Sequence, residues 1–135
     1  MFDTKIAILL RAGLAPWQGL NVTAFLASAV MGGSPELLGD TYADADGVKY
    51  LAMFRQPVLV FEGDSAMLTT AHRRALDRGL TVAVYTEELF ATGNDDDNRA
   101  AVRAVKTGDL NLVGLALHAP KNAVDKVLKG ASLHR

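Results

Sequence analysis

The stretch "KIAILLRAGLAPWQGLNVTAF", residues 5–25, decides the fold. Its first six residues are a continuous apolar run rich in strand formers, which is typical of a strand covered on both faces. From Pro16 the spacing becomes helical, because proline suits a first helical turn and the glycine pair at 32–33 suits a helix end. The stretch therefore predicts a buried strand that leads into a helix over residues 16–31.

This predicted first helix is apolar on almost every side. Only a narrow stripe has mixed character, formed by Trp17, Asn21, Ala24 and Ser28. A helix with so little polar surface is either deeply buried in its own domain or covered by a partner.

The rest of the chain alternates between strands and helices. Further strands are expected at residues 58–62, 81–85 and 110–117, and further helices at residues 65–78, 95–106 and 120–130. Residues 34–57 are irregular, but Asp46-Gly47 is a hairpin signal, so a small ribbon is expected there. The alternation predicts one α/β domain over residues 1–135, with helices on the faces of the sheet.

Local signals add detail to these helices. Asp64 is expected to cap the helix that follows it, and Thr86 to cap a short turn, "EELFA", that stops at Gly93. Asp95 and Asp96 are expected to start the next helix, where acids suit the helix dipole. The apolar face of the 65–78 helix is predicted to comprise Met67, Leu68, Ala71, Ala75 and Leu76.

Composition restricts the classes of function. The chain has 135 residues, half of them apolar, and a formal net charge of -1, so it lacks the basic excess of a dedicated nucleic-acid binder. It has no cysteine, which excludes disulfides and thiolate metal sites and fits a cytoplasmic location. The apolar run near the N-terminus is too short for a membrane span. We expect no cofactor and no membrane association.

Four segments together resemble a known family: "MFDTKIAILLR", "LAPWQGLNVTAFLAS", "EELFATGNDDDNRAAV" and "AVDKVLKGASLH". They resemble, in the same order and over almost the whole chain, a small bacterial family of unknown function that is grouped by fold with the type II peptidyl-tRNA hydrolases. The resemblance implies a three-layer α/β/α sandwich on a mixed, mostly parallel sheet of four to five strands. It also implies that strand 110–117 runs antiparallel to its neighbours.

The catalytic pattern of those hydrolases carries over poorly. They have a lysine and a glutamine at the start of the first helix, whereas "APWQGLNVTAF" has no lysine and offers Gln18 and Asn21 as its nearest polar groups. Their later Asp-Ala-Gly-Arg-Thr segment corresponds to "YTEELFATG", where Glu87 or Glu88 stands near the aspartate and Thr92 near the threonine. The fold is therefore expected to transfer and the activity is not.

A ligand site is predicted at the carboxyl ends of the first and third strands, which the resemblance implies are neighbours. Arg11 ends the first strand and can pair with a carboxylate or phosphate, and Trp17 can stack on a planar ligand. Gln18 and Asn21 complete the predicted ligand-binding set. The structural alternative is that Trp17 fills a gap between helix and sheet while Arg11 pairs with Glu87.

Catalytic candidates are few. Glu87, Glu88 and Thr92 are the residues considered for acid–base work, although adjacent acids that open a helical turn are also common surface residues. The "DDD" run at 95–97 lacks the spacing of a calcium loop, so no metal site is expected. His72 is interpreted as a histidine at the edge of the core, and no partner is predicted for His118 or His134.

Three hypotheses follow for function. The first is a binding domain or enzyme for an unidentified small molecule in the predicted crevice. The second is a non-catalytic module that works as a homo-oligomer, such as a homodimer, through the apolar first helix and the ribbon. The third, peptidyl-tRNA hydrolysis, rests on fold analogy alone.

Overall fold

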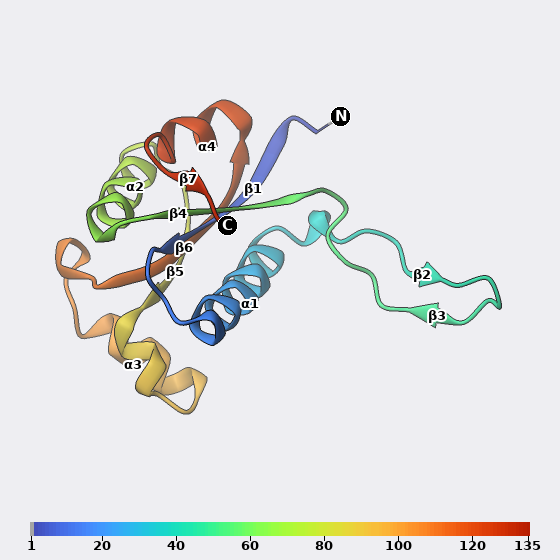
Figure 1. The fold of residues 1–135 in the computed structure, drawn as a ribbon, viewed down its shortest axis with the longest axis horizontal. Helices are drawn as coiled ribbons and strands as arrows, with labels where there is room; N and C mark the ends of the chain where they lie inside the picture. Colours follow the sequence, from blue (N-terminus) through green and yellow to red (C-terminus); the bar gives the residue numbers. More distant parts are fainter. Residues whose placement is uncertain (1) are drawn as a thin grey trace.

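The computed structural model, which describes residues 2–135, is a five-stranded sheet with helices on both faces and a long ribbon projecting from it (Figure 1). The sheet order is β5-β6-β1-β4-β7. Its strands are β1 (Thr4–Arg11), β4 (Val58–Gly63), β5 (Ala83–Thr86), β6 (Leu112–Pro120) and β7 (Ser132–Leu133). The helices are α1 (Pro16–Gly33), α2 (Ser65–Asp77), α3 (Asp95–Arg103) and α4 (Lys121–Val127). The short 3-10 turns are η1 (Pro35–Leu37), η2 (Glu87–Ala91) and η3 (Thr107–Asp109).

The order of the predicted strands and helices is confirmed, but the prediction of a mostly parallel sheet is wrong. Within residues 2–135, only β1 and β4 of this sheet pair in parallel, while β6 runs antiparallel to both β1 and β5, and β7 runs antiparallel to β4. The mostly parallel sheet was implied by the family resemblance, and the continuous apolar runs could not test it, because such runs report burial on both faces and not strand direction. The first and third predicted strands, β1 and β5, are also not neighbours, because β6 lies between them.

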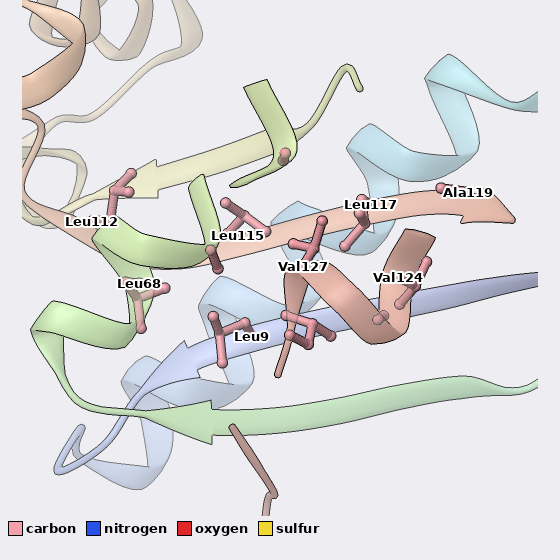
Figure 2. Close-up of a cluster of buried hydrophobic side chains, with 12 residues drawn as sticks. Leu9, Leu68, Leu112, Leu115, Leu117, Ala119, Val124 and Val127 are labelled. Atoms are coloured by element: carbon pink, nitrogen blue, oxygen red, sulfur yellow. The ribbon is translucent and has the colours of Figure 1, made fainter. Parts of the chain in front are cut away.

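Alternate residues of the sheet build two cores, one on each face. Ile6, Ile8 and Leu10 of β1 pack on the side covered by α1. Ala7 and Leu9 point to the other face, where Figure 2 shows Leu9 among side chains of β6, α2 and α4. This two-sided burial is what the continuous apolar run of β1 predicts.

The close approach of α1 to the sheet depends on a glycine. A Cβ added at Gly114 in β6 would lie 2.7 Å from Val22 Cγ1 and 2.8 Å from Leu26 Cδ1. Both side chains belong to the buried stripe of α1. The helix therefore packs where the strand offers no side chain.

The structure confirms some of the local predictions about the helices and corrects others. The carboxylate of Asp64 accepts from Met67 N at 2.8 Å, so the predicted cap of α2 is confirmed. The predicted cap of the short turn η2 by Thr86 is wrong. Thr86 is 1% exposed, and its side chain makes no hydrogen bond with any residue from 2 to 135. Leu76 was placed on the apolar face of α2, but it is 45% exposed. Helix α3 is capped by the side chain of Asn94 and ends at Arg103, short of the expected 106.

The apolar first helix is not deeply buried. Only Val22, Leu26 and Val30 of α1 are buried, whereas Trp17, Leu20 and Phe25 are exposed. The structure therefore excludes one of the two explanations for its apolar surface, deep burial in its own domain.

The predicted ribbon is the projecting arm of Figure 1, here defined as residues 38–54. Its strands β2 (Tyr42–Ala43) and β3 (Lys49–Tyr50) are antiparallel and close through a turn with Gly47 at φ +83°. Asp44 stabilises this turn, because its carboxylate accepts hydrogen bonds from the Tyr50 hydroxyl at 2.6 Å and from Val48 N at 3.0 Å. All residues of both strands are exposed.

Candidate functional site

The carboxyl ends of β1 and β5 lie at the same edge of the sheet, since both strands run antiparallel to β6. Arg11 Nη2 at the end of β1 donates to Glu87 Oε2 at the start of η2, at 2.6 Å. Arg11 Nη1 also reaches Asn111 Oδ1 at 3.4 Å, while Glu87 N donates to Asn111 O at 3.0 Å. The predicted convergence of these strand ends is therefore present, and Arg11 is held by the chain itself.

Four aromatic rings meet beside this ion pair. The centroids of Trp17 and Phe90 are 5.8 Å apart with the rings edge to face. Tyr85 lies 5.2 Å from Phe90 and 5.9 Å from Phe25, measured between centroids. Trp17 is 61% exposed, so it does not fill a gap in the core. Phe25, another member of the cluster, is also exposed. A cluster with exposed rings offers a face on which a planar molecule can stack.

The cluster forms one wall of an open cavity of about 450 Å³ between α1, β5, η2 and the start of α3. Its polar lining includes the amides of Asn21 and Asn98 and the hydroxyl of Thr92. The Thr92 hydroxyl contacts Asn98 Oδ1 and also lies 3.0 Å from Leu89 O. The complete lining is Trp17, Asn21, Phe25, Ser28, Tyr85, Leu89, Phe90, Thr92, Gly93, Asn94, Asp95 and Asn98.

Tyr85 is the most buried polar residue of this cavity. It is 5% exposed, and its hydroxyl has no hydrogen-bond partner among residues 2–135. Within this part of the chain, the Thr86 hydroxyl is the only side-chain polar atom that is both fully buried and without a partner. The Tyr85 hydroxyl is not in that class, so it keeps access to solvent. Burial raises the pKa of Tyr85 above its usual value of 10.0, so its hydroxyl keeps its proton near neutral pH. It is a donor available to a ligand.

Some of the predicted site residues line the cavity and others do not. Trp17, Asn21 and Thr92 line the cavity. Gln18 lies beside it with its side-chain oxygen accepting from Ala15 N at 3.0 Å, which caps the start of α1. Glu88 is exposed on η2 and is not part of the lining.

Sequence reasoning missed the aromatic wall. Tyr85 and Phe90 stand in segments that were interpreted as a strand and a short turn, and Asn98 stands in the helix expected over residues 95–106. The helical stripe of Trp17, Asn21 and Ser28 was the available signal, because all three line the cavity. Its polar members show which side of α1 faces the opening.

Two further features bear on the kind of site. Within residues 2–135, no group of three or more histidine, aspartate or glutamate side chains is arranged to hold a metal ion. None of the helices in that range combines the length and apolar character needed to cross a bilayer.

Comparison with known proteins identifies the family. The family described as protein of unknown function (DUF2000) matches residues 4–135. The chain belongs to the DUF2000 family. A solved structure, that of a protein of unknown function from Agrobacterium tumefaciens, is 44% identical, covers 100% of both chains and superposes with a TM-score of 0.98. No protein of curated function matches the chain. The DUF2000 relationship therefore supports the architecture and assigns no function, so a function can be argued only from the geometry of the site.

Proposed function

We propose that the protein binds a small planar molecule in the cavity walled by Trp17, Tyr85 and Phe90. The observation that carries the proposal is Tyr85, which is 5% exposed, lies between the rings of Phe25 and Phe90, and has a hydroxyl that is unpartnered within residues 2–135. Ligand pockets typically combine apolar walls with a few convergent polar groups, and this cavity has that composition.

The lining favours an uncharged ring over a phosphate-bearing ligand. Asp95 is the one ionisable side chain besides Tyr85 among the lining residues, and it pairs with Arg99 at 2.5 Å. Among the described residues, no lysine or arginine lines the cavity to compensate a phosphate. The amides of Asn21 and Asn98 can both donate and accept, which suits the ring nitrogens and carbonyl groups of a neutral heterocycle.

In this proposal Arg11 and Glu87 shape the cavity by holding η2, while Gln18 fixes the first turn of α1. A direct ligand contact by Arg11 requires the ion pair with Glu87 to open. Catalysis by Glu87, Glu88 or Thr92 stays a prediction, and Thr92 is the one of the three that lines the cavity.

A thermal-shift screen with neutral heterocycles, nucleosides and acylated aromatic amino acids tests the proposal. A ligand that binds only the native state raises the melting temperature by mass action. We expect the shift to be lost in Trp17→Ala and reduced in Tyr85→Phe, and to persist in Leu76→Ala, which removes an exposed side chain on the opposite face. A hit that survives Trp17→Ala and Tyr85→Phe would place the ligand elsewhere.

A second candidate function is self-association through the arm. The arm exposes the large apolar side chains of Leu38, Tyr42, Val48, Tyr50, Leu51 and Met53. An isolated two-stranded ribbon is marginally stable in water, and exposed apolar patches mark interaction surfaces. We propose a second copy of this chain as the occupant, because α1 exposes a further apolar surface that a partner would cover.

The oligomeric state tests this second candidate. Light scattering is expected to show a dimer for the wild type and a monomer for Leu51→Asp, which places a charge on the most exposed apolar side chain of the arm. Leu76→Asp, an equivalent change on α2, serves as the control and is expected to leave the dimer intact. A wild type that stays monomeric at high micromolar concentration would rule this candidate out.

We also propose that the fold is related to that of the type II peptidyl-tRNA hydrolases. Helices on both faces and a strand, β6, that runs antiparallel between β1 and β5 support the relationship. It does not extend to the reaction, because the first turns of α1 contain no lysine. Cleavage of a peptidyl-tRNA by the pure protein would contradict that restriction.

A further inference from the structure

A second cavity, of about 410 Å³, lies between the C-terminal part of α1 and strands β5 and β6. It shares no lining residue with the aromatic cavity. Two of its lining residues, Ser34 and His118, form a polar pair, with Ser34 Oγ 3.1 Å from His118 Nδ1. Both side chains are partly buried. Sequence reasoning found no partner for His118, because Ser34 is 84 positions away in the chain.

The other ring nitrogen of His118 is also held. His118 Nε2 lies 2.8 Å from Thr4 Oγ1, across the pairing of β6 with β1. Gln56 Nε2 in turn donates to Thr4 Oγ1 at 3.3 Å and to Thr4 O at 3.2 Å. The imidazole is thus fixed at both nitrogens, and one of them faces a serine hydroxyl at the cavity.

A nucleophile within hydrogen-bond reach of a base, with the base oriented by a third group, is the arrangement used for covalent catalysis. We propose that Ser34 and His118 form a nucleophile–base pair for acyl transfer from small uncharged esters. Thr4 and Gln56 are positioning residues. Thr4 Oγ1 accepts the Nε2 proton of His118, which leaves Nδ1 free to accept the proton of Ser34.

The steps balance without a co-reactant other than water. Ser34 Oγ bonds to the ester carbonyl carbon as its proton passes to His118 Nδ1. The bond between that carbon and the alcohol oxygen then breaks, and His118 returns the proton to the departing alcohol. Water repeats the sequence on the acyl-serine, releases the carboxylic acid and regenerates the Ser34 hydroxyl.

The residues that line this second cavity indicate which class of substrate it can bind. Apart from Ser34, His118 and Thr81, the cavity is lined by aliphatic residues and one glycine, with no carboxylate, lysine or arginine. Ala29, Val30 and Leu117 offer contact to a short alkyl chain. A short-chain acyl ester therefore fits better than a charged or peptide substrate.

Labelling with a fluorophosphonate and turnover of 4-nitrophenyl butyrate test the proposal on the full chain. We expect one phosphonyl group per chain, mapped to Ser34 by mass spectrometry, and slow ester hydrolysis. Ser34→Ala is expected to lose both by at least tenfold, whereas Ser65→Ala, which removes an exposed serine at the start of α2, is expected to keep both.

A rescue series separates catalysis from a structural role. Thr4→Val is expected to slow labelling and Thr4→Ser to restore it, with melting temperatures recorded for every variant. If Ser34→Ala does not fold, His118→Asn replaces it. The proposal is overturned if the folded wild type is not labelled, if the label maps to another residue, or if Ser34→Ala reacts as fast as the wild type.

Discussion

Arg11 Nη2 and Glu87 Oε2 lie 2.6 Å apart and connect the end of β1 to the start of η2 across the intervening strand β6. This contact anchors the turn that carries Phe90, and through Phe90 it fixes the wall of the aromatic cavity. The side chains of Arg11 and Glu87 are 25% and 44% exposed, so solvent screens their attraction.

Replacing Glu87 by Gln should therefore cost little stability. We expect a loss of about 1 kcal/mol or less in the free energy of unfolding, and a smaller loss at high salt. Urea unfolding of Glu87→Gln, Arg11→Gln and the double variant at two salt concentrations measures the coupling. A coupling well above about 2 kcal/mol would show that the pair behaves as a buried one.

Gly114→Ala should be strongly destabilising. The added methyl group would meet Val22 and Leu26 at under 3 Å, and overpacking of this kind costs roughly 1–3 kcal/mol. Gly32→Ala is the matched control, because nothing lies within 4 Å of its Cβ position and its φ is not positive. Chemical denaturation of both variants compares them, and equal stabilities would contradict the close approach of α1 to β6.

The elements of the fold were predictable where burial leaves a pattern in the chain. The continuous run of β1 and the cap at Asp64 indicated their elements correctly. Strand β7 was not predicted, because Ser132 and Leu133 owe their pairing to the edge of β4 and not to their own pattern. The predicted direction of the strands was also wrong, because the direction of a strand in a sheet is set by partners that lie far away in the chain.

The candidate site was predictable only in part. Trp17 and Asn21, which follow a strand end and share a helical stripe, and Thr92, which the resemblance pointed to, line the cavity. Tyr85 was missed as a donor, because a tyrosine at the end of an apolar strand looks like core until its neighbours are known. The pairing of His118 with Ser34 depends on a contact between α1 and β6 that no local pattern reveals.

Thr86→Val is expected to stabilise the protein. The Thr86 hydroxyl is buried and has no hydrogen-bond partner within residues 2–135, so its removal relieves an unsatisfied polar group while the side-chain volume stays nearly constant. We expect a gain of about 1 kcal/mol in the free energy of unfolding. Thr69→Val, on the exposed side of α2, is the control and should give no gain. A loss of stability in Thr86→Val would indicate that a bound water satisfies the hydroxyl.

His72 should make stability fall as the solution becomes acidic. Burial lowers the pKa of His72 below its usual value of 6.5, since the charged imidazole is disfavoured in the folded state. Above pH 6.5 the ring is neutral in both states and contributes no pH dependence. Below that value the unfolded chain binds the proton first, so stability declines until the folded-state pKa is reached, with a slope of at most about 1.4 kcal/mol per pH unit.

Replacing His72 by Leu should remove this slope. Urea unfolding between pH 7.5 and about 5 measures it, and the range brackets the ordinary histidine pKa of about 6.5. The matched control is His134→Gln, which changes an exposed histidine near Glu62 and should keep the decline that His72 causes. A wild type whose stability is constant over this range, or a His72→Leu variant with an unchanged slope, would show that the buried ring of His72 does not set the pH dependence.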